Sequence, residues 1–179
     1  MNLSELKQFC SRDPCRPNLY SPCSRGEWTY ATDGHIAVRV PRIEVTIDTP
    51  KYYPPIETLP FADAETIFTP APKIAIPEIG SRECERCSGR GHQHDCPDCK
   101  CECEGCGGTG QGYERASVGI GTAVFDAKYI ALILRLPNIQ FASPPKEIEP
   151  MAFRFNGGDG VLMPTHGPYA IHIQIAEAA

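Results

Sequence analysis

Residues 28–40 have the sequence WTYATDGHIAVRV, and this stretch decides how the first part of the chain is expected to fold. Residues 28–32 are rich in aromatic and β-branched side chains, and residues 36–40 consist mostly of Ile and Val. Both compositions are typical of β-strands. Asp33 and Gly34 between them form a common two-residue turn signal. The stretch therefore predicts a β-hairpin that turns at Asp33 and Gly34.

The segments on either side of this hairpin predict a short helix and a third strand. Asn2 and Glu5 have the spacing of a capping box, which predicts the start of a helix. The apolar residues behind this cap fall on one helix face: Leu3, Leu6, Phe9 and Cys10. Residues 43–47 alternate apolar with polar side chains, which is the pattern of a half-buried strand.

Residues 117–179 predict a second set of elements of the same kinds. We expect a strand over 118–124, weakened or bulged by Gly119 and Gly121, and then a helix that Asp126 caps and that continues through Leu136. Further strands are expected at 138–142 and 151–155, before a turn at 156–160, and at 161–163 and 171–175, after this turn. Each flanking part combines a helix with antiparallel strands, which predicts an α+β fold.

The 179 residues are expected to form one domain that carries a small insert. Residues 1–80 are the expected first half with a Pro-rich extension, residues 81–112 the insert, and residues 113–179 the second half. Seven prolines between residues 50 and 80 exclude long helices and central strands there. That part is expected to be extended surface chain with one helical turn around 62–68. Neither half alone has enough core, so the two halves are expected to pack together.

Charge and hydropathy favour a protein partner over nucleic acid or membrane. The chain has 17 Lys and Arg against 22 Asp and Glu, a formal net charge of −5. Proteins that depend on phosphate contacts usually carry a basic surplus, so direct DNA binding is possible in principle but is not favoured by charge. No apolar run approaches the ~20 residues that span a bilayer. The N-terminus lacks the pattern of a secretory signal, so we expect a cytoplasmic protein.

Seven of the ten cysteines lie between residues 84 and 106, and their spacing predicts a metal site. The pattern Cys-x-x-Cys-x-Gly-x-Gly occurs twice, beginning once at Cys84 and once at Cys103. Two thiolates three positions apart can reach one metal ion, and the glycines allow backbone amides to approach the sulfurs. Two such knuckles supply four sulfurs, so Cys84, Cys87, Cys103 and Cys106 are expected to hold one structural zinc ion.

The run between the two knuckles offers ligands for a second zinc ion. It contains three further cysteines and two histidines, enough for a Cys3His site: Cys96, Cys99, Cys101, His92 and His94. The ligand types alone also leave open an iron–sulfur cluster or a redox-active cysteine patch. A catalytic zinc fits less well, because four sulfurs leave no position for water.

The repeated knuckle resembles the cysteine-rich zinc module of the DnaJ-type co-chaperones over residues 81–112. In that family four such repeats bind two zinc ions, and the first repeat pairs with the fourth. The resemblance implies that Cys84, Cys87, Cys103 and Cys106 correspond to the outer site. The inner run departs from the family pattern, because Cys96-Pro-Asp-Cys99 lacks the trailing glycines.

A second resemblance lies in the flanking parts. Residues 29–38, with Ala31-Thr32-Asp33-Gly34-His35, resemble a signature of the bacterial DNA polymerase sliding clamp (β subunit). Residues 125–130 and 160–164 are similar to two further segments of a clamp domain, in the same order along the chain. In that family the first and last of these segments line a hydrophobic groove in which polymerases and other partners dock short peptides.

The clamp resemblance implies a partner-binding groove made of Thr32, Gly34, His35, Ile36, Val161, Met163 and Pro164. Taken without the resemblance, the same residues predict no more than a hairpin turn and a core strand. The clamp resemblance also implies a single domain made of two similar halves.

The function expected from these features is that of a non-enzymatic, zinc-binding protein-interaction module. The motifs His-Glu-x-x-His, Gly-x-Ser-x-Gly and Gly-Lys-Ser/Thr are absent from the sequence. By analogy, the protein would be encoded by a phage or mobile element and act on a replication or other nucleic-acid machine. The alternatives are an inhibitor of a host defence complex, similar to an anti-CRISPR protein, a chaperone-like protein that holds peptides through the cysteine-rich module, and a metalloenzyme.

Overall fold

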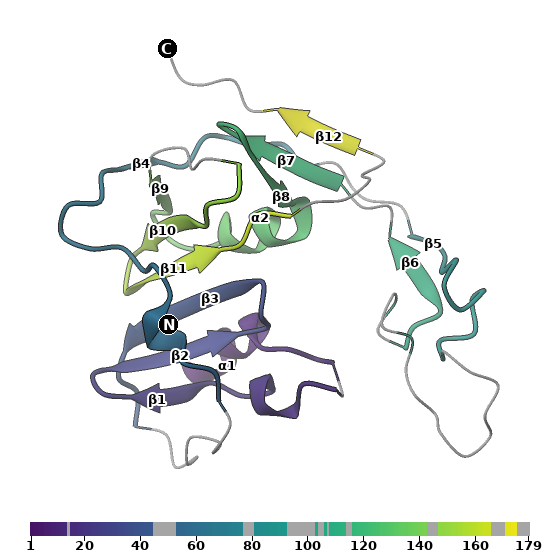
Figure 1. Cartoon of the computed structure of the whole chain (residues 1–179), viewed down its shortest axis with the longest axis horizontal. Helices are drawn as coiled ribbons and strands as arrows, with labels where there is room; N and C mark the ends of the chain where they lie inside the picture. The colour runs from purple at the N-terminus through teal and green to yellow at the C-terminus, as the bar shows by residue number, and fades with distance from the viewer. Residues whose placement is uncertain are drawn as a thin grey trace.

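The computed structural model describes residues 1–13, 15–44, 53–76, 81–92, 103, 106, 108–113, 116–142, 147–165 and 171–174. Within these residues the protein is a mixed α/β structure, built mostly from antiparallel strands with two short α-helices (Figure 1). The α+β class predicted from the sequence is confirmed at this level. None of the helices in these ranges is long and apolar enough to cross a membrane.

The central element is a seven-stranded antiparallel sheet in the order β1-β2-β3-β11-β10-β9-β4. Its strands are β1 Cys23–Arg25, β2 Trp28–Thr32, β3 Ile36–Pro41, β11 Gly158–Leu162, β10 Met151–Phe155, β9 Gln140–Ala142 and β4 Phe68–Pro70. The predicted hairpin of residues 28–40 is confirmed as β2 and β3, which turn at Asp33 and Gly34. β3 pairs with β11, which places Val38 opposite Gly160 and joins the two flanking parts of the chain in one sheet.

A second sheet has the order β12-β7-β8 and corrects two expectations. Its strands are β7 Ala116–Ile120, β8 Ala123–Asp126 and β12 Ile171–Gln174. The single strand expected over 118–124 is instead the hairpin of β7 and β8, because Gly121 adopts a φ of 61° and turns the chain. β12 pairs with β7 in parallel, so the expectation of antiparallel strands alone is wrong here.

Both predicted helices begin where the sequence places them. α1 (Leu3–Leu6) has the full capping box of Asn2 and Glu5, and it continues into the 3-10 helix η1 (Lys7–Phe9). α2 (Ala127–Ile133) is capped by Asp126, whose side chain accepts a hydrogen bond from the Lys128 N–H. α2 ends before Leu136, because the chain tightens into i→i−3 hydrogen bonds in the turn that precedes Pro137.

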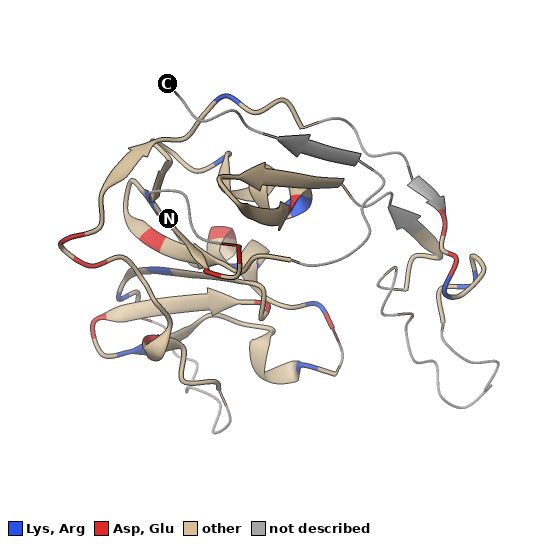
Figure 2. Cartoon of the chain, turned by 45° about the horizontal axis from the view of Figure 1, so that its top comes forward, with Lys and Arg blue, Asp and Glu red and all other residues tan. Residues whose placement is uncertain are grey.

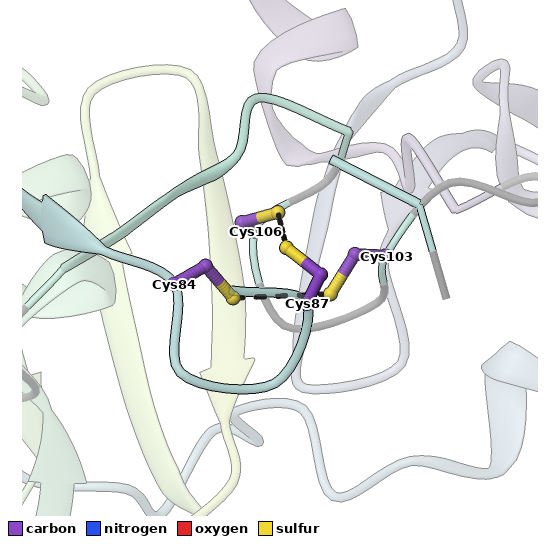
Figure 3. A group of neighbouring side chains, drawn as sticks. All are labelled: Cys84, Cys87, Cys103 and Cys106. Carbon is purple, nitrogen blue, oxygen red and sulfur yellow. Dashed lines mark hydrogen bonds between the residues drawn. The ribbon is translucent and has the colours of Figure 1, made fainter. Parts of the chain in front are cut away.

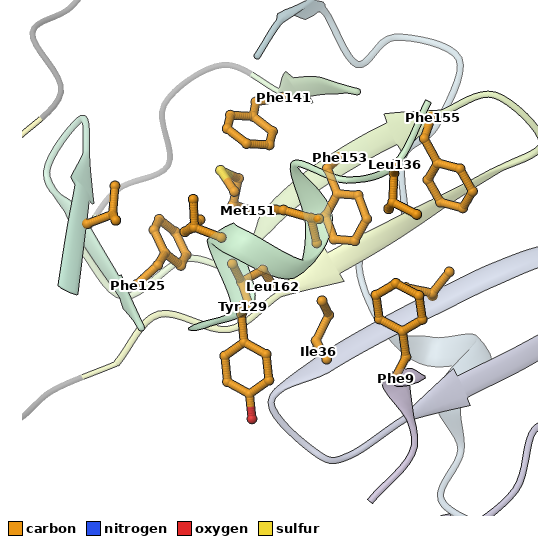
Figure 4. Packing of buried hydrophobic residues seen from close by; sticks show 14 of the residues in the cluster. Phe9, Ile36, Phe125, Tyr129, Leu136, Phe141, Met151, Phe153, Phe155 and Leu162 are labelled. Atoms are coloured by element: carbon orange, nitrogen blue, oxygen red, sulfur yellow. The ribbon is translucent and has the colours of Figure 1, made fainter. Parts of the chain in front are cut away.

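One hydrophobic core draws residues from both flanking parts of the chain. Leu6 and Phe9 of the first part pack in the same cluster as Phe125, Ile130 and Phe153 of the last part. Figure 4 shows this cluster between α2 and the strands of the seven-stranded sheet. The two parts therefore depend on each other for burial.

The first stretch of the Pro-rich part packs on the opposite face of the seven-stranded sheet. We call residues 53–62 the strap. Its Tyr53 and Ile56 are buried against Tyr30 and Ala37, whose side chains point away from the main core. The strap contains the 3-10 helix η3 (Ile56–Thr58). A further 3-10 helix, η2 (Pro17–Leu19), precedes β1, and its Leu19 lies in the same buried cluster as Ile56.

Two expectations about the middle of the chain are corrected or lie outside the described residues. The helical turn expected around 62–68 is absent; the turn is η3, and Phe68–Pro70 is the edge strand β4, where Pro70 is tolerated because an edge strand needs fewer donors. Of the strand expected over 43–47, Ile43 and Glu44 are not in a strand, and residues 45–47 lie outside the described ranges.

Candidate metal centre and binding groove

The four knuckle cysteines bring their sulfur atoms together at one point (Figure 3). The Sγ atoms of Cys84, Cys87, Cys103 and Cys106 all lie within 4.8 Å of one another. Cys84 Sγ is 3.8 Å from Cys103 Sγ, and Cys87 Sγ is 3.7 Å from Cys106 Sγ. Around a tetrahedral ion with metal–sulfur bonds of about 2.3 Å, the sulfurs are about 3.8 Å apart. A disulfide would require about 2.05 Å. The spacing is consistent with one zinc site.

The backbone of each knuckle is held by the other knuckle. The N–H of Cys84 donates to the carbonyl of Gly110 at 3.0 Å, and the N–H of Cys103 donates to the carbonyl of Gly91 at 2.8 Å. The strands β5 (Ser81–Glu83) and β6 (Gln111–Tyr113) pair beside them and close the hairpin. Figure 1 shows this hairpin to one side of the seven-stranded sheet. The two sequence repeats thus form one centre with approximate two-fold symmetry.

The glycines of the repeats are required by close backbone approach. Gly91 and Gly110 have φ values of 78° and 74°. A Cβ at Gly91 would collide with the carbonyl of Gly108, and a Cβ at Gly110 would collide with the carbonyl of Gly89. The same approach allows the N–H groups of Gly91 and Gly110 to donate to sulfur. The role that the spacing predicts for these glycines is therefore confirmed.

Burial and amide hydrogen bonds set the acidity of two of the thiols. Burial raises the pKa of Cys87 to about 11, although the Gly91 N–H donates to its sulfur. At Cys106 burial acts in the same direction, but the Gly110 N–H and the Cys87 thiol outweigh it and lower the pKa to about 7. Cys84, Cys87 and Cys103 are buried and Cys106 is partly buried. Four inward sulfurs suit a structural ion, because no coordination position is left for water.

The ligands predicted for a second zinc ion are not brought together within the described residues. His92 is described and exposed, and it does not belong to the four-sulfur group. Cys96, Cys99, Cys101 and His94 lie outside the described ranges. The second site stays a prediction.

A cavity of about 290 Å³ lies at the end of the β2–β3 hairpin, beside the end of β11. We call it the groove. Six of the seven residues predicted from the clamp resemblance line it, and Pro164 is not among the lining residues. The full lining consists of Leu19, Thr32, Gly34, His35, Ile36, Ala37, Pro54, Pro55, Ile56, Thr58, Leu59, Val161 and Met163. The Met163 N–H donates to the His35 carbonyl at 2.9 Å and holds the two predicted segments together.

One wall of the groove was not predicted from the sequence. Pro54, Pro55, Ile56, Thr58 and Leu59 of the strap face the groove, although this part was expected to be plain surface chain. Ile56 and Leu59 are three positions apart, which is the spacing of one face of a helical turn. That spacing was the available signal that this Pro-rich stretch packs on something.

The Asp33 turn at the groove is fixed by its own side chains and by α2. Asp33 Oδ1 accepts from the N–H groups of His35 and Ile36 at 2.8 and 3.1 Å, and Asp33 Oδ2 accepts from the Tyr129 hydroxyl at 2.6 Å. Thr32 Oγ1 accepts from the Gly34 N–H at 3.0 Å. The rim of the groove is thus tied to a helix from the other half of the chain.

Replacing Tyr129 with Phe is expected to lower the free energy of unfolding by about 1–2 kcal/mol, because a hydrogen bond to a carboxylate is lost while the ring stays. Burial and the adjacent Asp33 raise the pKa of Tyr129 above its usual value. The unfolded chain therefore ionises first above about pH 10, and the advantage of the wild type should shrink there. Urea unfolding at pH 7 and above pH 10 measures both effects. Equal stability at pH 7 would show that the bond contributes nothing.

No family model matches the chain, and neither does any curated protein or solved structure. Its function must be inferred from the geometry of the metal centre and the groove.

Proposed function

We propose that the protein is a non-enzymatic interaction module that binds a short apolar segment of a partner protein in the groove. A structural zinc ion at Cys84, Cys87, Cys103 and Cys106 would hold the β5–β6 hairpin folded. The observation that carries the proposal is the groove itself, a cavity of about 290 Å³ built from four separate segments of the chain.

The size and lining of the groove favour apolar side chains as its occupants. A cavity of about 150 Å³ holds one benzene molecule, so the groove has room for about two large apolar side chains but not for a folded surface. None of its lining residues is Lys, Arg, Asp or Glu. A phosphate backbone would gain no ion pair from this lining.

The distribution of charge also favours a protein partner. Figure 2 shows acidic and basic positions interspersed along the described chain. The net charge of the whole chain is −5. A nucleic-acid-binding surface usually carries clustered Lys and Arg. We therefore propose that any role at a nucleic-acid machine is exerted through a protein component of that machine.

The order of elements supports the resemblance to a sliding-clamp domain. One helix (α1) precedes the meander β1-β2-β3, and another (α2) precedes the meander β9-β10-β11. The last strands of the two meanders, β3 and β11, pair antiparallel at the centre of the sheet. Two similar halves related in this way are what the resemblance implies. On this basis we propose a partner in replication or a related machine, with a phage or mobile element as the source.

Replacing Met163 with Glu is expected to weaken binding of a groove peptide at least tenfold, because a carboxylate would have to be buried in an apolar cavity. Met163 is 39% exposed, so the variant should fold. The probe is the best short peptide selected by the wild type from a displayed random library, and affinity is measured by calorimetry.

The matched control for this prediction is Ile148→Glu. Ile148 is 74% exposed and is not a lining residue, so its variant should bind the peptide like the wild type. Equal affinity of the Met163→Glu variant and the wild type would show that the peptide binds elsewhere. Failure of the wild type to select any peptide would overturn the proposed function.

A further inference from the structure

The strap, residues 53–62, is held on the sheet at two points by arginines from the strands beneath it. At the first point, Arg25 of β1 pairs with Glu57 through hydrogen bonds of 2.8 and 3.0 Å. Arg25 also donates to the Tyr53 carbonyl at 3.2 Å, and its guanidinium lies 5.6 Å from the centre of the Tyr53 ring. One side chain thus fixes both ends of residues 53–57.

The second point is Arg39 of β3. Its guanidinium lies between two aromatic rings, 4.6 Å from the centre of the Trp28 ring and 4.4 Å from that of Phe61. Arg39 also donates to the Ala62 carbonyl at 3.3 Å. Asp159 of β11 holds this guanidinium in place through two hydrogen bonds of 2.6 and 2.9 Å. The far end of the strap is therefore fixed to the centre of the sheet.

The residues between these two points form a stiff wall. Pro54 and Pro55 have restricted φ angles, and the 3-10 turn that follows is closed by the Thr58 hydroxyl, which donates to the Pro55 carbonyl at 2.7 Å. The Leu59 N–H donates to the Ile56 carbonyl at 3.2 Å. Ile56 is 2% exposed and anchors the turn, while Leu59 is partly buried and lines the groove. The wall is fixed before any ligand enters.

We propose that the strap determines the specificity of the groove, and that Leu59 limits the size of the apolar side chain that the groove accepts. This inference rests on the proposed function of the groove. A rigid apolar wall discriminates side chains that differ by one or a few carbon atoms, because the larger one collides and the smaller one leaves a void. Arg25, Glu57 and Arg39 act as positioning residues, since they hold the wall without lining the groove.

The test compares peptides selected from a displayed random library by the wild type and by Leu59→Ala. We call the apolar side chain that the selected peptides share the anchor residue. The expected result is that Leu59→Ala selects a larger apolar anchor residue than the wild type does. A peptide with the larger anchor should bind the variant about tenfold better than it binds the wild type. The matched control is Ile67→Ala, which removes the same kind of side chain from a position that is 72% exposed and outside the groove. It should select the wild-type anchor.

A second variant tests the positioning role without changing the lining. Glu57→Gln breaks the ion pair with Arg25 and should reduce the affinity ratio between small-anchor and large-anchor peptides at least threefold. Glu65→Gln makes the same charge change at an exposed position of the Pro-rich part and should leave the ratio unchanged. Suppose that neither Leu59→Ala nor Glu57→Gln alters peptide selection while Met163→Glu still weakens binding. The groove is then the binding site, and the proposal that the strap sets its specificity is wrong. If the wild type selects no peptide, the proposed function itself has failed.

Discussion

Replacing Cys87 with Ser is expected to remove one zinc ion per chain and to unfold the β5–β6 hairpin while the seven-stranded sheet stays folded. Cys87 is fully buried, and its sulfur lies 3.7 Å from that of Cys106. The hairpin has two strands of three residues each, and such a hairpin is marginal on its own. The buried residues of its cluster are all cysteines. Structural zinc contributes about 10–16 kcal/mol to small zinc domains, so no other interaction here can replace it.

Elemental analysis after dialysis gives the zinc content of the wild type and the variant, and NMR amide spectra show which part of the chain loses its fold. The control is Cys15→Ser, which changes an exposed cysteine outside the four-sulfur group and should retain all the zinc. Unchanged zinc in Cys87→Ser would refute the assigned centre. Iron in place of zinc in the wild type would identify the metal as iron. Loss of the whole β-structure in Cys87→Ser would contradict the prediction that residues 81–112 form an insert that folds separately from the seven-stranded sheet.

The elements that the sequence predicts well are those with local signals. Asp33 and Gly34 specify a tight turn within the hairpin, and Asn2 and Glu5 satisfy each other within one helical turn. The knuckles are equally local, because two cysteines three positions apart meet within a single turn of chain. Such features involve few residues, so their geometry depends little on the rest of the fold.

The features that the sequence does not predict depend on partners far along the chain. β1 is only three residues long and forms because β2 pairs with it. The strand expected at 171–175 is present as β12, but its parallel pairing with β7 joins residues that are far apart in the sequence. The strap lies against the sheet because Arg25 and Arg39 reach Glu57 and Ala62. The spacing of Ile56 and Leu59 indicates an apolar face, but nothing within residues 50–80 specifies which strands this face packs on. For this reason the sequence does not predict the wall of the groove that the strap forms.

Replacing Asp159 with Ala is expected to lower the free energy of unfolding by about 3 kcal/mol. Asp159 lies directly opposite Arg39 in the β3–β11 register, and only 12% of its side chain and 18% of the Arg39 side chain are exposed. Removing one partner of a mostly buried ion pair leaves an uncompensated charge, which costs about 3–5 kcal/mol when burial is complete. Because both side chains keep some exposure to solvent, we expect a loss at the lower end of this range. Urea unfolding measures it, and Glu65→Ala, which removes an exposed carboxylate, should change stability by less than about 0.5 kcal/mol.

The double variant Arg39→Met, Asp159→Leu separates the cost of an unpaired charge from the loss of packing. Apolar side chains of similar volume often replace a buried ion pair with little loss of stability, so this variant should regain most of what Asp159→Ala loses. Its peptide selectivity should nevertheless differ from that of the wild type, because Met cannot donate to the Ala62 carbonyl as Arg39 does. We therefore expect near-wild-type stability together with altered peptide selectivity. Wild-type stability with wild-type selectivity would mean that packing between Trp28 and Phe61 alone holds the strap. Stability that stays as low as in Asp159→Ala would mean that β3 and β11 need the ion pair to stay in register.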